Sequence, residues 1–128
     1  SYIDDSKGTN VGATLSAIQG LAPTIKGQLV LIAGGLSKGA DFGDLLTPVA
    51  QHVRAMILMG ADAPKIAKAL EGAAPIYLVQ SMDEAVKKAR DIAMLGDCVL
   101  LSPACASFDM FNDYHHRGEV FNQSVQSL

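Results

Sequence analysis

The sequence predicts an α/β domain of three layers, in which a mostly parallel sheet of five to six strands is covered by helices on both faces. Two observations predict this fold. Short apolar runs of strand length alternate with longer amphipathic segments five times along the chain, and this order produces parallel strands joined by right-handed crossovers. The central runs are apolar at nearly every position, as expected of strands that are buried on both faces.

Size and composition fit a single domain. The 128 residues are 49% hydrophobic and 18% charged, with a net charge of −3, so there is no broad basic face to bind nucleic acid. No apolar run is long enough to cross a bilayer. The chain begins without Met inside what is predicted to be a strand, so we expect it to be a fragment of a longer protein.

In the first half of the chain, periodicity defines five elements. The predicted elements are a strand at 2–4, a helix at 11–21, a strand at 29–33, a helix that includes Phe42, Leu45, Leu46, Val49 and Val53, and a strand at 54–59. The polar loop before the first helix ends in Thr9 and Asn10, which are good N-cap residues. The second strand stops at the pair Gly34-Gly35.

The second half continues the same alternation. Here the predicted elements are a helix at 62–70, a strand at 76–79, a helix at 82–92 capped by Ser81, a strand at 98–101, and a helix whose last part is 119–128. No internal repeat, linker or low-complexity tract interrupts this pattern. The whole chain, 1–128, is therefore predicted to be one Rossmann-like domain.

Three of the loops that follow strands carry polar groups suited to an acidic ligand. In an open parallel sheet the ligand lies beyond the carboxyl ends of the strands. The first loop carries Lys7 and Thr9, the second carries Lys38, and the last carries Ser107 at the start of a helix. Taken singly, each lysine is more often a solvated charge and each hydroxyl more often a helix cap. Their shared placement favours a ligand with more than one negative group, such as a dicarboxylic acid.

Other candidate sites are weaker. The glycine-rich segment 34–38 lacks the ending of a phosphate-binding loop. The three histidines, at positions 52, 115 and 116, have no partners at metal-ligand spacing, so no metal site is predicted. Cys98 and Cys105 are interpreted as small buried residues, which fits a reducing cytoplasm. Adjacent residues of a strand face opposite ways, so at most one of Asp4 and Asp5 faces the cleft.

Three motifs together resemble the C-terminal domain of the Mur ligases. They are DSKGTN at 5–10, GG at 34–35 with KGADF at 38–42, and LSPACASFD at 101–109 with RG at 117–118. They occur in order and span essentially the whole chain. Within the family they look most like the members that add D-glutamate.

The resemblance implies an ATP-dependent amide ligase of bacterial peptidoglycan synthesis. In that family ATP phosphorylates the carboxylate of a nucleotide-linked substrate, here UDP-N-acetylmuramoyl-L-alanine, and the amine of the incoming amino acid attacks the acyl phosphate. The UDP-binding domain, the central ATPase domain and the Mg²⁺ ligands are absent from this chain. We therefore expect the domain to be inactive alone. We also expect the full enzyme to be a cytoplasmic monomer.

The resemblance also implies roles for individual residues. The position of Lys38 pairs with a D-glutamate carboxylate in the family, and those of Thr9 and Ser107 hydrogen-bond to carboxylates. Further pocket contacts match Phe108 and Tyr114. On domain closure, Asp5 matches a residue that contacts the ATP ribose, and Lys7 one that lies near the phosphates.

Two alternatives stay open at this point. One is the equivalent domain of a sister ligase that adds a different amino acid, because pocket size cannot be read from sequence. The other is a non-catalytic module of flavodoxin-like shape that binds a small anion.

Overall fold

The computed structural model describes residues 2–5, 10–35, 41–102 and 114–128. Five strands and five α-helices alternate along the described chain. The strands are β1 (Tyr2–Asp4), β2 (Leu29–Gly34), β3 (Val53–Met59), β4 (Ile76–Leu78) and β5 (Cys98–Leu101). The helices are α1 (Val11–Leu21), α2 (Leu46–His52), α3 (Ala63–Ala69), α4 (Met82–Ile92) and α5 (Tyr114–Gln126), with 3₁₀ turns η1 (Ala22–Thr24) and η2 (Gly43–Leu45).

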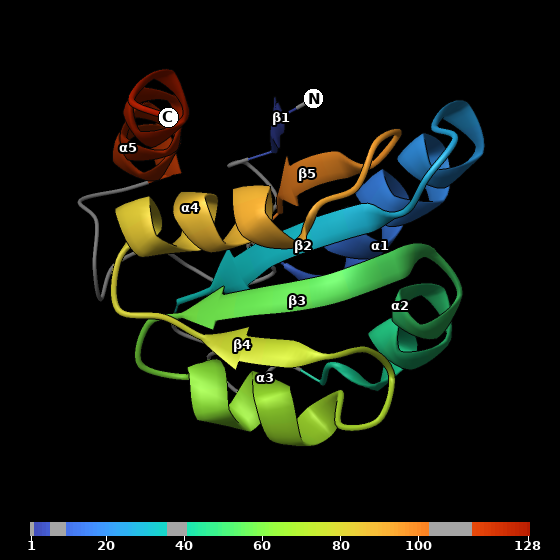
Figure 1. The fold of residues 1–128 in the computed structure, drawn as a ribbon. Helices are drawn as coiled ribbons and strands as arrows, with labels where there is room; N and C mark the ends of the chain where they lie inside the picture. Colours follow the sequence, from blue (N-terminus) through green and yellow to red (C-terminus); the bar gives the residue numbers. More distant parts are fainter. Residues whose placement is uncertain (1, 6–9, 36–40, 103–113) are drawn as a thin grey trace.

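All five strands form one parallel sheet in the order β1-β5-β2-β3-β4. The last strand of the sequence, β5, therefore lies between the first two. Figure 1 shows β2, β3 and β4 side by side, with their arrows pointing the same way. The predicted parallel α/β fold is confirmed, with five strands in the described part of the chain.

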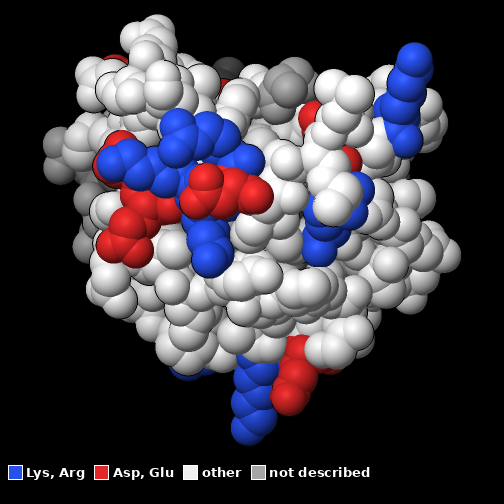
Figure 2. All heavy atoms as spheres, viewed as in Figure 1, with Lys and Arg blue, Asp and Glu red and all other residues white. Residues whose placement is uncertain are grey.

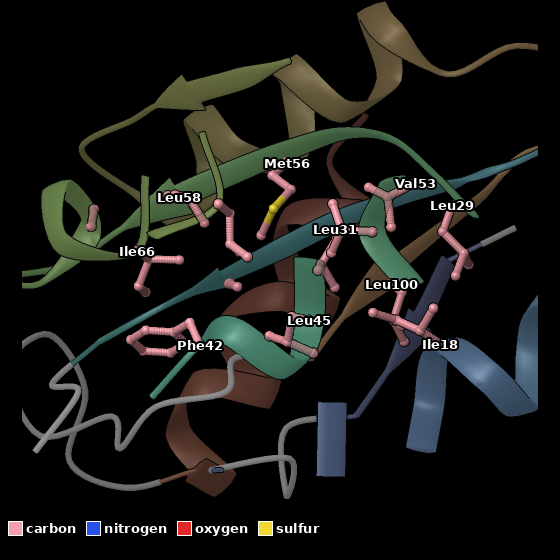
Figure 3. Close-up of a cluster of buried hydrophobic side chains, with 14 of the residues drawn as sticks. Ile18, Leu29, Leu31, Phe42, Leu45, Val53, Met56, Leu58, Ile66 and Leu100 are labelled. Carbon is pink, nitrogen blue, oxygen red and sulfur yellow. The ribbon is translucent and has the colours of Figure 1, made fainter. Parts of the chain in front are cut away.

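Helices cover both faces of the sheet. Successive side chains of a strand point to opposite faces, so β2 sends Leu31 to one core and Val30 to the other. The first core packs β2, β3 and β5 against α1, α2 and α3 (Figure 3). The second packs the same strands against α4 and α5. A strand between two cores must be apolar throughout, which explains the uninterrupted apolar runs.

The predicted caps begin two of the helices. The side chain of Asn10 accepts a hydrogen bond from the Ala13 N–H at 2.8 Å and begins α1. Ser81 Oγ accepts one from the Glu84 N–H at 3.1 Å and begins α4. Each cap satisfies a backbone donor that has no partner within its helix.

Several predicted boundaries are wrong by one or a few residues. The helix predicted to include Val53 ends at His52, because Val53 pairs with Leu29 in the sheet. Its first turn is the separate 3₁₀ turn η2, and Leu46 at the start of α2 is 40% exposed. The helix predicted at 62–70 is Ala63–Ala69, and the strand predicted at 76–79 ends at Leu78.

Candidate functional site

The carboxyl edge of the sheet gathers three strand ends. β1, β5 and β2 are neighbours, and the chain leaves them at Asp5, Ser102 and Gly35. The helices after β1 and β2 pack on one face, whereas α5, after β5, packs on the other. Connections that depart to opposite faces leave a crevice between neighbouring strands, where open α/β sheets bind ligands.

Gly34 shapes the exit from β2. Its φ is +132°, a conformation that side chains disfavour, and a Cβ built there would lie 1.9 Å from the Met59 carbonyl oxygen of β3. Glycine lets the two strand ends approach this closely. The next residue, Gly35, also has a positive φ, and its carbonyl accepts a hydrogen bond from the Asp62 N–H at 3.1 Å.

Between β1 and β5, three polar side chains form one hydrogen-bonded chain, which we call the Asp5–Ser102–Thr14 network. Ser102 Oγ donates to Asp5 Oδ2 at 2.9 Å. Thr14 Oγ1, on α1, lies 3.0 Å from Ser102 Oγ and 3.2 Å from the Ser102 carbonyl oxygen. Both hydroxyl residues are 0% exposed, whereas Asp5 is half-buried. The backbone is tied as well, because the Asp5 N–H donates to the Leu101 carbonyl at 2.7 Å.

Of the residues predicted to form the site, Asp5 is the one whose side chain the structure describes. Five others lie outside the described residues: Lys7, Thr9, Lys38, Ser107 and Phe108. Tyr114 is the first residue of α5, and its side chain lies outside the described part as well. Of the acidic pair at the end of β1, Asp5 bonds to Ser102, and Asp4 is exposed.

Sequence reasoning missed Ser102 and Thr14. Ser102 belongs to the LSPACASFD motif, but the sequence alone assigns it no role. Thr14 lies three residues after Val11 and four before Ile18, on the inward stripe of α1. A hydroxyl on an otherwise apolar inward face needs a buried partner. The helical spacing of Thr14 with Val11 and Ile18 is therefore the sequence signal that indicates a buried hydrogen bond at this position.

A second polar contact lies at the opposite, amino edge of the sheet. Asp97, just before β5, accepts hydrogen bonds from Arg54 Nε at 2.6 Å and from Arg54 Nη2 at 3.2 Å. It also accepts from the backbone N–H groups of Gln28 at 2.8 Å and Met94 at 2.9 Å. Burial acts to raise the pKa of Asp97, but these donors outweigh it and hold the pKa below its ordinary value. This contact lies at the edge of the sheet opposite to the carboxyl edge, where the ligand is expected. We therefore assign it a structural role.

The remaining titratable and reactive residues add no second site in the described part of the chain. Cys98 is a buried free cysteine, as predicted, and Cys105 lies outside the described residues. No group of three or more His, Cys, Asp and Glu side chains that could hold a metal ion occurs in the ranges that the structure describes. Within the same ranges, no helix is long and apolar enough to span a membrane.

Surface charge is mixed on the face shown in Figure 2. Acidic and basic side chains lie intermixed over the region where α4 runs. One exposed pair there joins Lys87 Nζ to Asp83 Oδ2 at 2.9 Å. Such a face offers no continuous patch of a single sign to a polyanion.

Two hollows of about 540 and 470 Å³ border the edge strand β4. Tyr77 and Lys88 line the first, and Pro64 and Gln80 line the second. Leu78 and Val79 are common to both. Neither hollow is lined by Asp5 or Ser102, so both are separate from the Asp5–Ser102–Thr14 network.

Comparison of the sequence with known proteins identifies its relatives. The family described as "Mur ligase, glutamate ligase domain" matches residues 1–105. The UDP-N-acetylmuramoylalanine--D-glutamate ligase of Pseudomonas aeruginosa is 56% identical over 128 residues, which are 100% of this chain and 29% of that protein. The enzyme of the same name from Nitrosococcus oceani is 54% identical over 127 residues, 99% of this chain and 28% of that protein. The chain thus spans less than a third of the length of these curated relatives.

Solved structures share the fold. A bifunctional folylpolyglutamate synthase/dihydrofolate synthase from Yersinia pestis, complexed with AMPPNP and a Mn ion, matches with a TM-score of 0.60 and 21% identity, over 90% of this chain and 26% of that chain. A Haemophilus ducreyi domain, ascribed to a UDP-N-acetylmuramate:L-alanyl-gamma-D-glutamyl-medo-diaminopimelate ligase, matches with a TM-score of 0.56 and 13% identity, over 98% of this chain and 89% of that domain. At these identities the likeness concerns the fold alone.

Proposed function

Because this chain belongs to the Mur ligase family as its glutamate ligase domain, we propose that it is the amino-acid-binding domain of a ligase that adds D-glutamate to UDP-N-acetylmuramoyl-L-alanine. The observation that carries the proposal is the 56% identity, over all 128 residues, to a relative named for that reaction. At this identity we expect the binding loops to keep their chemistry.

The strand order supports the same proposal. The three loops that carry the motif residues follow β1, β5 and β2, which are adjacent in the sheet. The described residues at the start of these loops, Asp5, Ser102 and Gly35, lie at one edge. Loops with these starting points can contribute to one pocket without crossing another strand.

In the proposed reaction ATP transfers its terminal phosphoryl group to the carboxylate of UDP-N-acetylmuramoyl-L-alanine. The amine of D-glutamate then attacks the acyl phosphate, and phosphate leaves as the amide forms. In our proposal Lys38 pairs with a carboxylate of D-glutamate, Thr9 and Ser107 hydrogen-bond to its carboxylates, and Phe108 and Tyr114 line its pocket. This domain contributes proximity, since it holds the amine beside an acyl phosphate formed elsewhere.

The nucleotide is the second ligand in the proposal. A carboxylate at the end of a strand suits the hydroxyl groups of a ribose, which donate hydrogen bonds, and we assign that contact to Asp5. Lys7 would lie near the phosphates when the domains close. ATP and Mg²⁺ would be held mainly by parts of the enzyme outside this chain. We place the enzyme in the cytoplasm as a monomer.

Replacement of Lys38 tests the proposal. In the full-length ligase, Lys38→Ala should raise the Michaelis constant for D-glutamate, or lower kcat, by about ten- to a hundredfold, because a charge-assisted hydrogen bond to a carboxylate is lost. Steady-state kinetics of phosphate release would measure this. Lys87→Ala is the matched control, because that lysine is 57% exposed on α4. Normal kinetics for Lys38→Ala would refute the assignment.

The same assay separates the alternatives. A panel of amino acids tests for a sister ligase, which would prefer an acceptor other than D-glutamate. A full-length protein that binds small anions without releasing phosphate would indicate the non-catalytic module.

A further inference from the structure

We propose that Ser102, held by Thr14, is a positioning residue that fixes the Asp5 carboxylate in the orientation required to bind the ribose of the nucleotide. The inference rests on the proposed function, because it assumes the ribose contact of Asp5. It adds a role for Ser102, to which the LSPACASFD motif assigns none, and a role for Thr14, which lies outside the three motifs.

Proton counting sets the direction of the Asp5–Ser102–Thr14 network. An ionised carboxylate only accepts hydrogen bonds, so the single hydroxyl proton of Ser102 goes to Asp5 Oδ2, 2.9 Å away. Thr14 is then the donor to Ser102, and its single hydroxyl proton is shared between Ser102 Oγ at 3.0 Å and the Ser102 carbonyl oxygen at 3.2 Å. Thr14 therefore donates to Ser102, and Ser102 donates to Asp5. Hydrogen bonds aligned in series polarise one another and strengthen the bond to the carboxylate.

Burial makes this arrangement rigid. Thr14 lies in α1 and Ser102 directly follows β5, and both side chains are 0% exposed. The Ser102 N–H also donates to the Ile32 carbonyl of β2 at 3.1 Å. Ser102 thus has fixed partners on both sides, and its hydroxyl defines where Asp5 Oδ2 lies.

Among the described residues, Ser102 takes only Oδ2 of Asp5, which leaves Oδ1 for a ligand. Asp5 is half-buried at the carboxyl edge, and its backbone N–H is already used by Leu101. With Oδ2 fixed by Ser102, the plane of the carboxylate is set and Oδ1 can accept from a ribose hydroxyl. A carboxylate ordered before binding loses less side-chain freedom when the nucleotide arrives.

The test is a double-mutant cycle in the full-length ligase. Asp5→Ala should raise the Michaelis constant for ATP about tenfold or more. Ser102→Ala and Thr14→Val should each raise it about three- to tenfold, with the constant for D-glutamate changed less than about twofold. In the Asp5→Ala background, the effect of Ser102→Ala should disappear, because Ser102 acts through Asp5. Thr14→Ser keeps the hydroxyl and should restore normal kinetics.

Controls separate positioning from folding. Ser124→Ala removes another buried hydroxyl, 8% exposed on α5, and should leave both Michaelis constants unchanged. Thermal unfolding identifies any variant that fails to fold. If Ser102→Ala does not fold, Thr14→Val takes its place in the test, because valine is close in shape to threonine. If Asp5→Ala raises the constant for ATP but Ser102→Ala acts additively, or raises both constants alike, the inference is wrong and the proposed function stands. If Asp5→Ala leaves the constant for ATP unchanged, the ribose contact is wrong and the inference falls with it.

Discussion

Asp97 anchors the amino edge of the sheet. Its side chain is 0% exposed, and both of its oxygens accept hydrogen bonds. The donors come from segments that lie far apart in sequence, since Gln28 precedes β2 and Arg54 lies in β3. A Cβ on Gly27 would lie 2.2 Å from Asp97 Oδ1, so this loop also needs glycine to approach so closely. One carboxylate thus joins the starts of three neighbouring strands.

We predict that Asp97→Asn destabilises the domain by about 2–4 kcal/mol. Oδ1 accepts from Gln28 and Arg54, and Oδ2 accepts from Arg54 and Met94. Whichever way the asparagine amide turns, its NH₂ group faces other donors. Urea denaturation followed by circular dichroism would measure the change.

An exposed ion pair provides the control for this variant. Asp83→Asn removes the contact with Lys87, in which both side chains are more than half exposed. It should cost about 0.5 kcal/mol or less, since solvent screens such pairs. If Asp97→Asn and Asp83→Asn lowered the free energy of unfolding equally, the burial of Asp97 would add nothing to stability.

Asp97 also predicts how stability depends on pH. In the folded protein its pKa is held below the ordinary value of about 3.9. Unfolding therefore takes up a proton in acid. The contribution of Asp97 to stability is complete well above pH 4 and is lost as the pH falls through 4 toward the folded pKa. Denaturation curves between pH 7 and 3 should show a smaller acid loss for Asp97→Asn than for the wild type, and parallel curves would contradict the assignment.

At the scale of elements, α4 depends on its cap. Ser81 accepts the hydrogen bond that begins this helix, and the helix supplies Met82, Ala85, Val86 and Ala89 to the second core. We predict that Ser81→Ala costs about 1 kcal/mol, which corresponds to a fall in Tm of about 3 to 6 °C. Thermal unfolding would measure this.

The cap prediction has a direct control. Ser81→Asp keeps an acceptor at the cap and should retain most of the stability. Kinetics should be unchanged in both variants, because Ser81 follows β4, which lies at the opposite end of the strand order from β1 and β5. A loss of D-glutamate binding in Ser81→Ala would contradict that separation.

Element boundaries show where local patterns fail. The register of β2 against β3 shifts between Leu29 and Val30, so Arg54 has no partner on β2. This bulge re-aims a side chain, and Arg54 reaches Asp97 from it. In the sequence Val53 merely continues an apolar helical spacing. Pairing with Leu29 makes it a strand residue instead.

For the whole molecule, we predict that the chain binds D-glutamate by itself but forms no amide. The parallel sheet has a core on each face, built wholly from this chain. NMR titration with D-glutamate should shift amides near Thr9, Lys38 and Ser107, together with those of Asp5, Gly35 and Ser102, and L-glutamate should shift them less. No shifts at tens of millimolar would show that the pocket needs the rest of the enzyme.

Some of the functional prediction depended on the resemblance rather than on physical pattern. Strand ends, glycines and loop hydroxyls predicted an acidic ligand at the carboxyl edge. The three motifs predicted the family, which the match over residues 1–105 confirms. The assignments of Thr9, Lys38, Ser107, Phe108 and Lys7 stay predictions, because they lie outside the described residues. So does that of Tyr114, whose side chain is not described.

The sequence by itself determined the elements of this protein. Helix and strand periods, caps and glycine breaks are local properties, and they placed every strand within about a residue. Tertiary structure alone decided the order β1-β5-β2-β3-β4, which inserts β5 between β1 and β2. That order brings Ser102 to Asp5, 97 residues apart, and Asp97 to Arg54, 43 residues apart. An apolar run predicts that a strand is buried, but it does not predict which strand lies beside it. Any parallel strand can satisfy the same backbone hydrogen bonds.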